Sequence, residues 1–376
     1  MSKLDEVYRQ CQGSELQFKR RAVLFIGSES YDAPTITVLQ GLHKLGFTIY
    51  TLKKPNINSW FCNAVVDSLD HVRFDFVLSN LHWGTRWSYY ERYKLWPYLK
   101  ILIDGDDNQG NESWKAKYAR YARSYVYDPP EALKSMKLHP YRWIEPLGDY
   151  KPDVVFTAQK VPGDSGTFYL PFGIHEEYME FYEGKATHER DIDFAYIPGP
   201  GVRRERAEHW IRRLSRCRLL PGRIYNRPAR GDEAAPEEIR EYVAEDNNVH
   251  SYHRWTMSKV YFRILNRTKV LIYPGVSDSA WWDSKRPWEA YVSGCLVLMA
   301  RPTIDVAEYP LTEICEYAVY NSTLELIEKS WFLYLRPRFL DKLRLTAVAR
   351  AWQFFSTVAI ARYFLARIAS AIGLPK

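Results

Sequence analysis

Short apolar runs alternate with polar loops and with longer mixed segments along most of the chain. The first run, Ala22 to Ile26, leads through a polar loop into a predicted helix from Thr35 to Lys44, which Gly46 ends before a second apolar run. A strand, a loop, a helix and a second strand in this order predict a parallel sheet with the connecting helices on its faces. In the first half of the chain, strands are predicted at 22–26, 47–52, 74–79, 99–103, 124–127, 153–157 and 167–170, with a helical segment at 83–98.

The same pattern begins again after residue 190. Strands are predicted at 191–197, 270–273 and 296–299, and helices at 256–266 and 324–330. Residues 1–20 are predicted to be a solvated lead-in, and residues 221–248, which are rich in Pro, Gly, Arg and Glu, a surface excursion. Since 376 residues are enough for about two domains, we predict an α/β protein of two Rossmann-like domains with parallel sheets that face an interdomain cleft. The predicted boundaries are 1–186, 187–336 and a helical tail at 337–376 that packs back on the first lobe.

Charge and cysteine content narrow the class of protein. The net charge of +7 favours an anionic partner, but a phosphorylated small molecule or an anionic membrane surface is sufficient, and nucleic acid is not required. The five cysteines form no Cys-x-x-Cys pattern, and this indicates a reducing compartment without a zinc site. The first residues lack the apolar core of a signal peptide, so the predicted location is cytoplasmic.

Candidate chemistry is concentrated between residues 270 and 300. Pro274 and Gly275 close a predicted strand, and a polar loop leads to Ser284, a candidate N-cap for a short helix that ends at Gly294. Lys285 and Arg286 at the N-terminus of this helix are suited to bind a phosphate, because unpaired backbone N–H groups and the helix dipole also favour an anion there. Glu289 could then accept hydrogen bonds from sugar hydroxyls. The alternative is that Glu289 is a surface residue paired with Lys285.

The residues from Arg286 to Leu298, RPWEAYVSGCLVL, resemble a segment of the C-terminal domain of GT-B glycosyltransferases, R-x-x-E-A-x-x-x-G-x-x-x-L. The spore-maturation-protein-like and exostosin-like glycosyltransferases are the most similar branches. The resemblance implies that Glu289 binds the ribose of a nucleotide-sugar donor and that Gly275, Lys285 and Arg286 lie by its diphosphate. Many retaining members carry a second Glu eight positions earlier, where this chain has Trp281, so the resemblance leaves the stereochemical outcome open.

Other loops supply further candidates for the donor and acceptor sites. A glycine-containing loop after the strand at 191–197 precedes Arg203 and Arg204, whose planar guanidinium groups match phosphate oxygens; the alternative is a solvated helix face. In the family, the helix that carries Tyr261 lies near the nucleotide base. Ser28 and Glu29, in the first loop, are candidates for the cleft and equally for capping the following helix.

An acidic cluster follows the strand at 99–103. Asp106 or Asp107 is a candidate general base for the acceptor hydroxyl, and His82 is an alternative base, although a lone His beside Trp83 is more often packed. A rival interpretation is a GT-A-like, metal-dependent glycosyltransferase that holds a divalent cation with Asp104, Asp106 and Asp107.

Together these features predict a glycosyltransferase that moves a sugar from a nucleotide-diphosphate donor to a hydroxyl of a glycan, lipid-linked or protein acceptor. No metal, other cofactor or nucleic-acid partner is expected. A non-catalytic module that binds sugar nucleotides or glycans is the alternative from another class. The basic tail helices are expected to brace the first lobe or, alternatively, to contact the inner face of a membrane.

Overall fold

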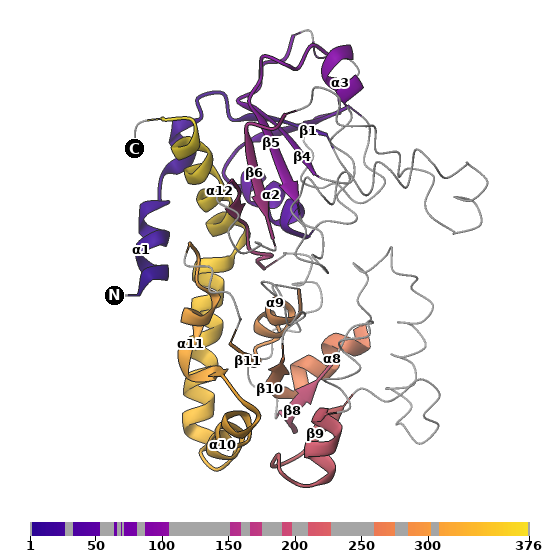
Figure 1. Ribbon diagram of the computed structural model, residues 1–376, viewed down its shortest axis with the longest axis vertical. Helices are drawn as coiled ribbons and strands as arrows, with labels where there is room; N and C mark the ends of the chain where they lie inside the picture. Colours follow the sequence, from indigo (N-terminus) through magenta and orange to yellow (C-terminus); the bar gives the residue numbers. More distant parts are fainter. Residues whose placement is uncertain are drawn as a thin grey trace, which may run out of the picture.

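The computed structural model shows two parallel sheets, one above the other in Figure 1, in a chain whose two halves repeat the same construction. Each sheet, with the helices that cover it, forms one lobe, here called the N-lobe and the C-lobe. The structure describes residues 2–26, 33–52, 64–65, 69, 71–80, 87–104, 151–158, 166–174, 190–197, 210–226, 259–274, 285–301 and 308–374.

The N-lobe sheet has seven strands in the order β3-β2-β1-β4-β5-β6-β7, all paired in parallel. Its central strands are buried on both faces, which explains why they are uninterrupted apolar runs in the sequence. The strand order reverses between β1 and β4. The elements are β1 (Ala22–Ile26), α2 (Ala33–Lys44), β2 (Thr48–Thr51), β3 (Ala64–Val65), β4 (Phe76–Asn80), α3 (Trp87–Arg92), β5 (Lys100–Asp104), β6 (Val154–Thr157) and β7 (Phe168–Tyr169).

The C-lobe sheet has five parallel strands in the order β12-β11-β10-β8-β9, with its reversal between β8 and β10. Together the two parallel sheets confirm the predicted fold class. The elements are β8 (Ile192–Tyr196), β9 (Ile224–Asn226), α8 (Lys259–Arg267), β10 (Thr268–Tyr273), α9 (Lys285–Val292), β11 (Leu296–Ala300), β12 (Val319–Tyr320) and α10 (Thr323–Tyr334). Short 3-10 turns occur at Leu311–Ile314 and Glu316–Ala318.

The tail forms two long helices that run along one side of both lobes (Figure 1). The first, α11 (Pro337–Phe355), packs against α9 and β11 of the C-lobe, whereas α12 (Thr357–Ala371) packs against α2 of the N-lobe. Between them, Ser356 has an extended backbone (ψ 157°), and its hydroxyl accepts a hydrogen bond from Ala359 N (3.4 Å), which caps α12. The ring of Phe364 on α12 lies 4.5 Å from that of Phe156 in the N-lobe sheet. Among the described residues, no helix is both long enough and apolar enough to cross a membrane.

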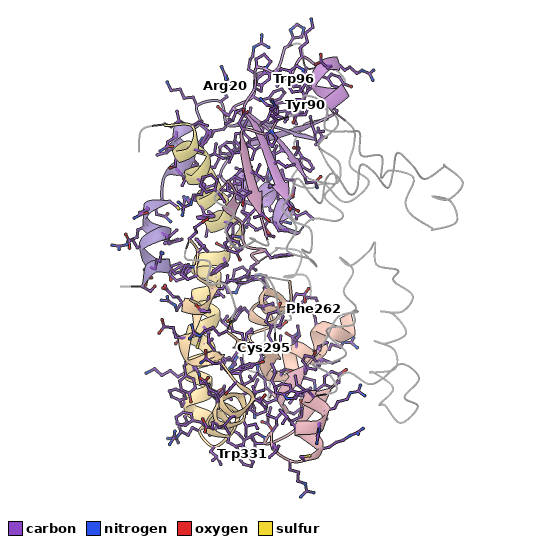
Figure 2. All side chains as sticks on the ribbon, viewed as in Figure 1. Arg20, Tyr90, Trp96, Phe262, Cys295 and Trp331 are labelled. Atoms are coloured by element: carbon purple, nitrogen blue, oxygen red, sulfur yellow. The ribbon has the colours of Figure 1, made fainter. Side chains whose placement is uncertain are left out.

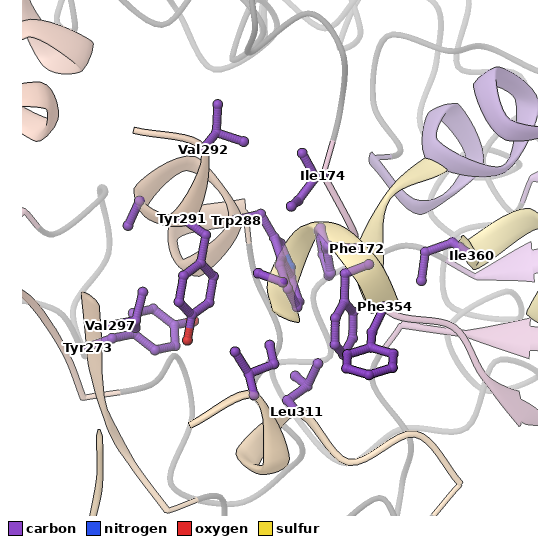
Figure 3. Packing of buried hydrophobic residues seen from close by; sticks show 14 of the residues in the cluster. Phe172, Ile174, Tyr273, Trp288, Tyr291, Val292, Val297, Leu311, Phe354 and Ile360 are labelled. Carbon is purple, nitrogen blue, oxygen red and sulfur yellow. The ribbon is translucent and has the colours of Figure 1, made fainter. Parts of the chain in front are cut away.

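The two lobes meet in a continuous apolar core (Figure 3). Trp288 of α9 stacks on Phe355, with ring centroids 4.5 Å apart and an interplanar angle of 29°. From the N-lobe side, Ile174 donates its backbone N–H to the Phe355 carbonyl (2.8 Å), and Thr37 donates its hydroxyl to the Phe172 carbonyl. Ile174, near the end of the N-lobe part of the chain, therefore lies beside the junction between α11 and α12.

Residues 2–20 differ from the predicted solvated lead-in. They form α1 (Lys3–Gln10), which begins with a capping box between Ser2 and Asp5, and a 3-10 turn at Ser14–Gln17. Leu4 and Phe18 are buried in the core, and Glu15 forms an ion pair with Arg362 of α12 (2.9 Å). The prediction was wrong because the apolar partner of this segment lies at the other end of the chain.

Other differences concern short elements. The predicted surface excursion at 221–248 contains the whole of β9, which pairs with β8 at Phe194↔Ile224. Of the helical segment predicted at 83–98, α3 spans Trp87–Arg92, and the described residues 93–98 that follow it are not helical. The strand predicted at 124–127 lies outside the described residues, as do the residues on both sides of the predicted 186/187 boundary.

Gly41→Ala tests the contact between α2 and α12. In an ordinary helix this change stabilises by about 1 kcal/mol. Here a Cβ would overlap the Thr357 carbonyl and lie 2.6 Å from Ala361 Cβ, so we expect a loss of about 1–3 kcal/mol from overpacking. The measurement is urea unfolding, with Lys44→Ala at an exposed position of the same helix as control. A Gly41→Ala protein as stable as the parent would contradict the close approach.

Asp191→Asn tests an ion cluster at the amino ends of the C-lobe strands. Asp191 accepts a hydrogen bond from Arg267 Nε (2.8 Å) and forms an ion pair with Arg223 (2.5 Å). The hydrogen bond from Arg267 is the largest of the causes that lower the pKa of Asp191 from 3.8 to about 2. A lowered folded-state pKa gives stability that is present above pH 4 and lost as the pH falls from about 4 to about 2. Asn should therefore destabilise at pH 7 and make no difference near pH 2, in thermal unfolding at a series of pH values. A difference that is independent of pH would contradict this expectation.

Candidate functional site

The strand order locates the candidate site in each lobe. In open parallel sheets, ligands bind outside the carboxyl ends of the strands, where the strand order reverses. In the C-lobe these are the ends of β8 and β10, which lead into the loops before Arg203 and before α9. In the N-lobe they are the ends of β1 and β4, which lead into the loops that carry Ser28, Glu29 and His82. The topology thus brings the separately predicted loops of each lobe to one edge of its sheet.

Helix α9 begins with the two predicted cations. Lys285 and Arg286 are its first residues, and Pro287 lies in the first turn, where its missing N–H interrupts no helical hydrogen bond. Arg286 Nη1 lies 3.3 Å from Glu289 Oε2, and the side chains are 15% and 0% exposed, respectively. The helix therefore presents a guanidinium at its positive end, held from behind by a buried carboxylate.

The burial of Glu289 contradicts one of the two interpretations of this residue. Glu289 is not a surface residue, since its side chain is fully buried, and among the described side chains its ion-pair partner is Arg286. A carboxylate that is fully removed from water requires charged or hydrogen-bonding partners to remain ionised. Whether Glu289 also reaches a ribose stays a prediction from the resemblance.

The opposite end of α9 is held by two buried arginines, Arg190 and Arg344. Arg190 Nη2 donates to the Ser293 carbonyl (2.5 Å), and Arg344 Nη1 donates to the Gly294 carbonyl (2.8 Å). Gly294 has φ +78°, and a Cβ there would lie 2.6 Å from Arg190 Nη2, so only glycine fits this approach. Cations at a helix C-terminus are favoured by the carbonyl dipoles.

Arg190 also binds the end of the neighbouring helix. Its Nη1 donates to the carbonyls of Leu265 (3.1 Å) and Thr268, where α8 passes into β10. The same side chain thus joins the C-termini of α8 and α9, the two helices that carry the donor-site candidates Tyr261, Lys285, Arg286 and Glu289. We call the pair Arg190 and Arg344 the arginine clamp.

The arginine clamp places two like charges in a buried position. Burial, and after it the neighbouring Arg190, lowers the pKa of Arg344 from its ordinary value. Asp341 lies 3.6 Å from Arg344 and compensates one charge. Cys295, 3.9 Å from Arg190 Nη1, has its pKa raised by burial to about 11 and stays a neutral thiol. Among the described residues, main-chain carbonyls therefore supply most of the hydrogen bonds that compensate the buried charges of Arg190 and Arg344.

The N-lobe contributes one described acidic side chain to its carboxyl edge. Asp104 is the last residue of β5 and is buried, and its main-chain carbonyl accepts from Ala158 N (2.9 Å). Asp106 and Asp107 follow within three positions but lie outside the described residues. Within the described part of the chain, no three His, Cys, Asp or Glu side chains gather as a metal site would require.

The remaining predicted residues stay predictions. Tyr261 lies on α8 and Lys285 lies on α9, where the structure describes their backbone but not their side chains. Ser28, Glu29, His82, Arg203, Arg204 and Gly275 lie outside the described residues.

Sequence reasoning missed the arginine clamp. Residues 190, 294 and 344 come from three distant parts of the chain, so no local spacing connects them. The one local signal is Gly294 after the last turn of the helix, which marks a C-terminus but does not name its partners.

Arg190→Met should destabilise the protein by at least about 3 kcal/mol, because several buried carbonyls lose a charged donor. Arg190→Lys should not restore the loss, since an ammonium lacks the planar fork that reaches two helix ends. Urea unfolding measures both, and Arg263→Met at an exposed position of α8 is the matched control. Equal stability of the Arg190→Met and control proteins would show that the arginine clamp does not hold the helices.

Comparisons with known proteins extend over nearly the whole chain at low identity. No protein-family model matches, and no curated protein matches. Among solved structures, a glycosyltransferase from Rickettsia africae ESF-5 covers 93% of this chain and 98% of its own, at 12% identity and a TM-score of 0.45. The glycosyltransferase of kitacinnamycin covers 94% and 99%, at 12% identity and 0.44. A DNA-modifying β-glucosyltransferase covers 94% and 100%, at 11% identity and 0.45. At these values the similarity decides neither family nor activity, so function is inferred from the chain's own residues.

Proposed function

We propose that the protein is a glycosyltransferase that takes a sugar from a nucleotide-diphosphate donor bound in the C-lobe and passes it to a hydroxyl presented by the N-lobe. The observation that carries the proposal is the pair of Arg286 and buried Glu289 at the N-terminus of α9, beside the point where the C-lobe strand order reverses. A helix N-terminus with an oriented guanidinium is a site for a diphosphate.

The donor diphosphate would lie against α9. Arg286, Lys285 and the first N–H groups of α9 would bind its oxygens, with Gly275 allowing close approach of the preceding loop and Arg203 or Arg204 closing from the β8 side. These cations would stabilise the charge that develops on the leaving diphosphate, which lowers the barrier to transfer. Glu289 would accept from the ribose hydroxyls, and Tyr261 would lie near the base.

The acceptor would approach from the N-lobe edge. Asp106 or Asp107, just beyond the carboxyl end of β5, would take the proton from the acceptor hydroxyl, with His82 as the alternative base. Ser28 and Glu29 would contact the acceptor in the cleft. The proposed acceptor is a glycan, a lipid-linked saccharide or a protein, and the proposed location is the cytoplasm.

In this proposal the reaction needs no metal, because the leaving diphosphate meets fixed cations. The rival mechanism places a divalent metal on Asp104, Asp106 and Asp107. The two mechanisms differ in the metal dependence of donor binding, and that difference can be measured directly.

We expect one nucleoside diphosphate to raise the thermal midpoint without metal. The screen contains UDP, GDP, ADP, CMP and dTDP, each with EDTA or with Mn²⁺. A ligand at 100 times its Kd adds about 2.7 kcal/mol of stability, an effect that is visible in a thermal shift. Stabilisation that requires Mn²⁺ would favour the metal-dependent rival, and no response to any of the five would contradict a nucleotide site.

Variants then test the roles of the residues. Arg286→Gln should weaken diphosphate binding about tenfold to hundredfold, the value of a charged hydrogen bond. The double variant Arg286→Gln/Glu289→Gln removes the buried ion pair as a unit, and its thermal midpoint shows how much stability the single variant loses because Glu289 is left unpaired. Asp106→Asn/Asp107→Asn should keep donor binding and abolish sugar transfer, measured as diphosphate release with acceptor. A parent protein that binds the nucleotide and transfers no sugar to any acceptor would instead be a binding module.

A further inference from the structure

The far end of the C-lobe carries an exposed surface that the proposed reaction does not use. One of its two segments is residues 210–223, which are helical from 210 to 216 and then lead to β9. The other is residues 331–346, which contain the end of α10 and the beginning of α11. We call these two segments the basic tip. Figure 2 shows Trp331 at the end of the molecule away from the N-lobe.

Two contacts fix the segments of the basic tip side by side. Trp331 Nε1 donates to the Leu219 carbonyl (2.9 Å). Gly222 lies against the ring of Tyr334, since a Cβ at position 222 would be 2.7 Å from Tyr334 Cε2. The basic tip is therefore one surface formed by segments that are more than a hundred residues apart in sequence.

Large apolar side chains are exposed on this surface. Leu335 is 68% exposed, and the rings of Trp331 and Tyr334 meet edge to face at 6.2 Å. The structure exposes nine large hydrophobic residues among those described, and six belong to the basic tip: Leu219, Trp331, Tyr334, Leu335, Phe339 and Leu345. An exposed apolar cluster of this kind marks a contact surface.

Positive charge is concentrated in the same place. The two segments contain nine Arg and Lys residues and one acid, a net charge of +8, whereas the whole chain carries +7. The rest of the chain is therefore close to neutral. Arg344 is buried in the arginine clamp and Arg223 pairs with Asp191, but six cations are exposed without a carboxylate partner among the described residues: Arg213, Arg216, Arg218, Arg336, Arg338 and Lys342.

The arginines of the tail helices beyond the basic tip are occupied inside the protein. Arg350 lies 3.9 Å from Asp5, Arg362 pairs with Glu15, and Arg367 lies over the ring of Tyr363. These side chains attach the tail to the rest of the molecule. A membrane contact is therefore better suited to the basic tip, where the cations are exposed, than to the surface of α12.

We propose that the basic tip docks the protein on the surface of an anionic lipid bilayer. Trp and Tyr favour the boundary between headgroups and acyl chains, and Arg and Lys extend to lipid phosphates. Leucines exposed among them gain by entering the acyl region. A nucleic acid would match the cations and could stack on the aromatic rings, but it offers nothing to Leu219 and Leu335. The observations thus favour a membrane over nucleic acid.

The proposal is independent of the glycosyl-transfer reaction and is tested with lipid alone. The full chain is mixed with vesicles of phosphatidylcholine, with or without about 30% phosphatidylserine, and binding is measured by flotation. We expect binding to the anionic vesicles only, weakened by salt at about 0.5 M. Leu335→Ser and Arg338→Gln/Lys342→Gln should each lower the partition coefficient at least about tenfold.

Matched controls come from the N-lobe. Leu16→Ser changes an equally exposed leucine, and Lys19→Gln/Arg73→Gln removes two exposed cations; both should bind vesicles as the parent does. Circular dichroism and thermal midpoints verify that every variant is folded. Absence of binding to anionic vesicles, or equal losses in tip and control variants, would overturn the proposal. So would tip-dependent binding to a DNA duplex in the absence of vesicle binding.

Discussion

The arrangement of the C-lobe depends on charges buried at both ends of an eight-residue helix. At its N-terminus, α9 holds Arg286 against a fully buried Glu289, and at its C-terminus the arginine clamp binds the last carbonyls. Burying a charge is costly unless partners replace water, so each of these groups must be held in a narrow geometry. A short helix fixed in this way can present its first turn to a ligand with little reorganisation, which is what electrostatic stabilisation of a leaving group requires.

The rest of the molecule supports α9 from one side. Trp288 stacks on Phe355 where α11 ends, and Tyr309 donates its hydroxyl to the Phe354 carbonyl at the same junction. The helix that carries the proposed donor site is therefore packed directly on the connection between the lobes. A donor that binds at α9 would therefore contact the same helix that packs on the junction of α11 and α12, where the two lobes are joined.

The sequence predicted those parts of the fold whose signals are local. The strands at 22–26 and 296–299 were readable because parallel strands buried on both faces are continuous apolar runs. The same is true of α9, which has Pro287 in its first turn and Gly294 after its last. Arg286 and Glu289 were found as candidates because their spacing and the surrounding segment are themselves local.

Features that depend on distant partners could not be predicted in this way. Leu4 and Val7 look like isolated apolar residues in a polar segment, and their burial is explained by the packing of α1 against α11 and α12. Arg190 and Arg344 appear as ordinary basic residues because the carbonyls that they bind belong to other elements. Candidates outside the described residues, such as Asp106 and Arg203, belong to sequence segments with no periodic pattern from which a position could be derived.

The two connections between the lobes lie next to each other, because Ile174 bonds to Phe355 beside Ser356. The C-lobe is therefore inserted into the N-lobe, whose core contains both the β1–β7 sheet and α12 from the end of the chain. During synthesis, domains generally fold as units, with the N-terminal one first. In this protein the N-lobe cannot complete its core first, because the C-lobe sheet can form while the ribosome still holds the residues of α12. The lobe that is made first can be finished only when α12 has emerged.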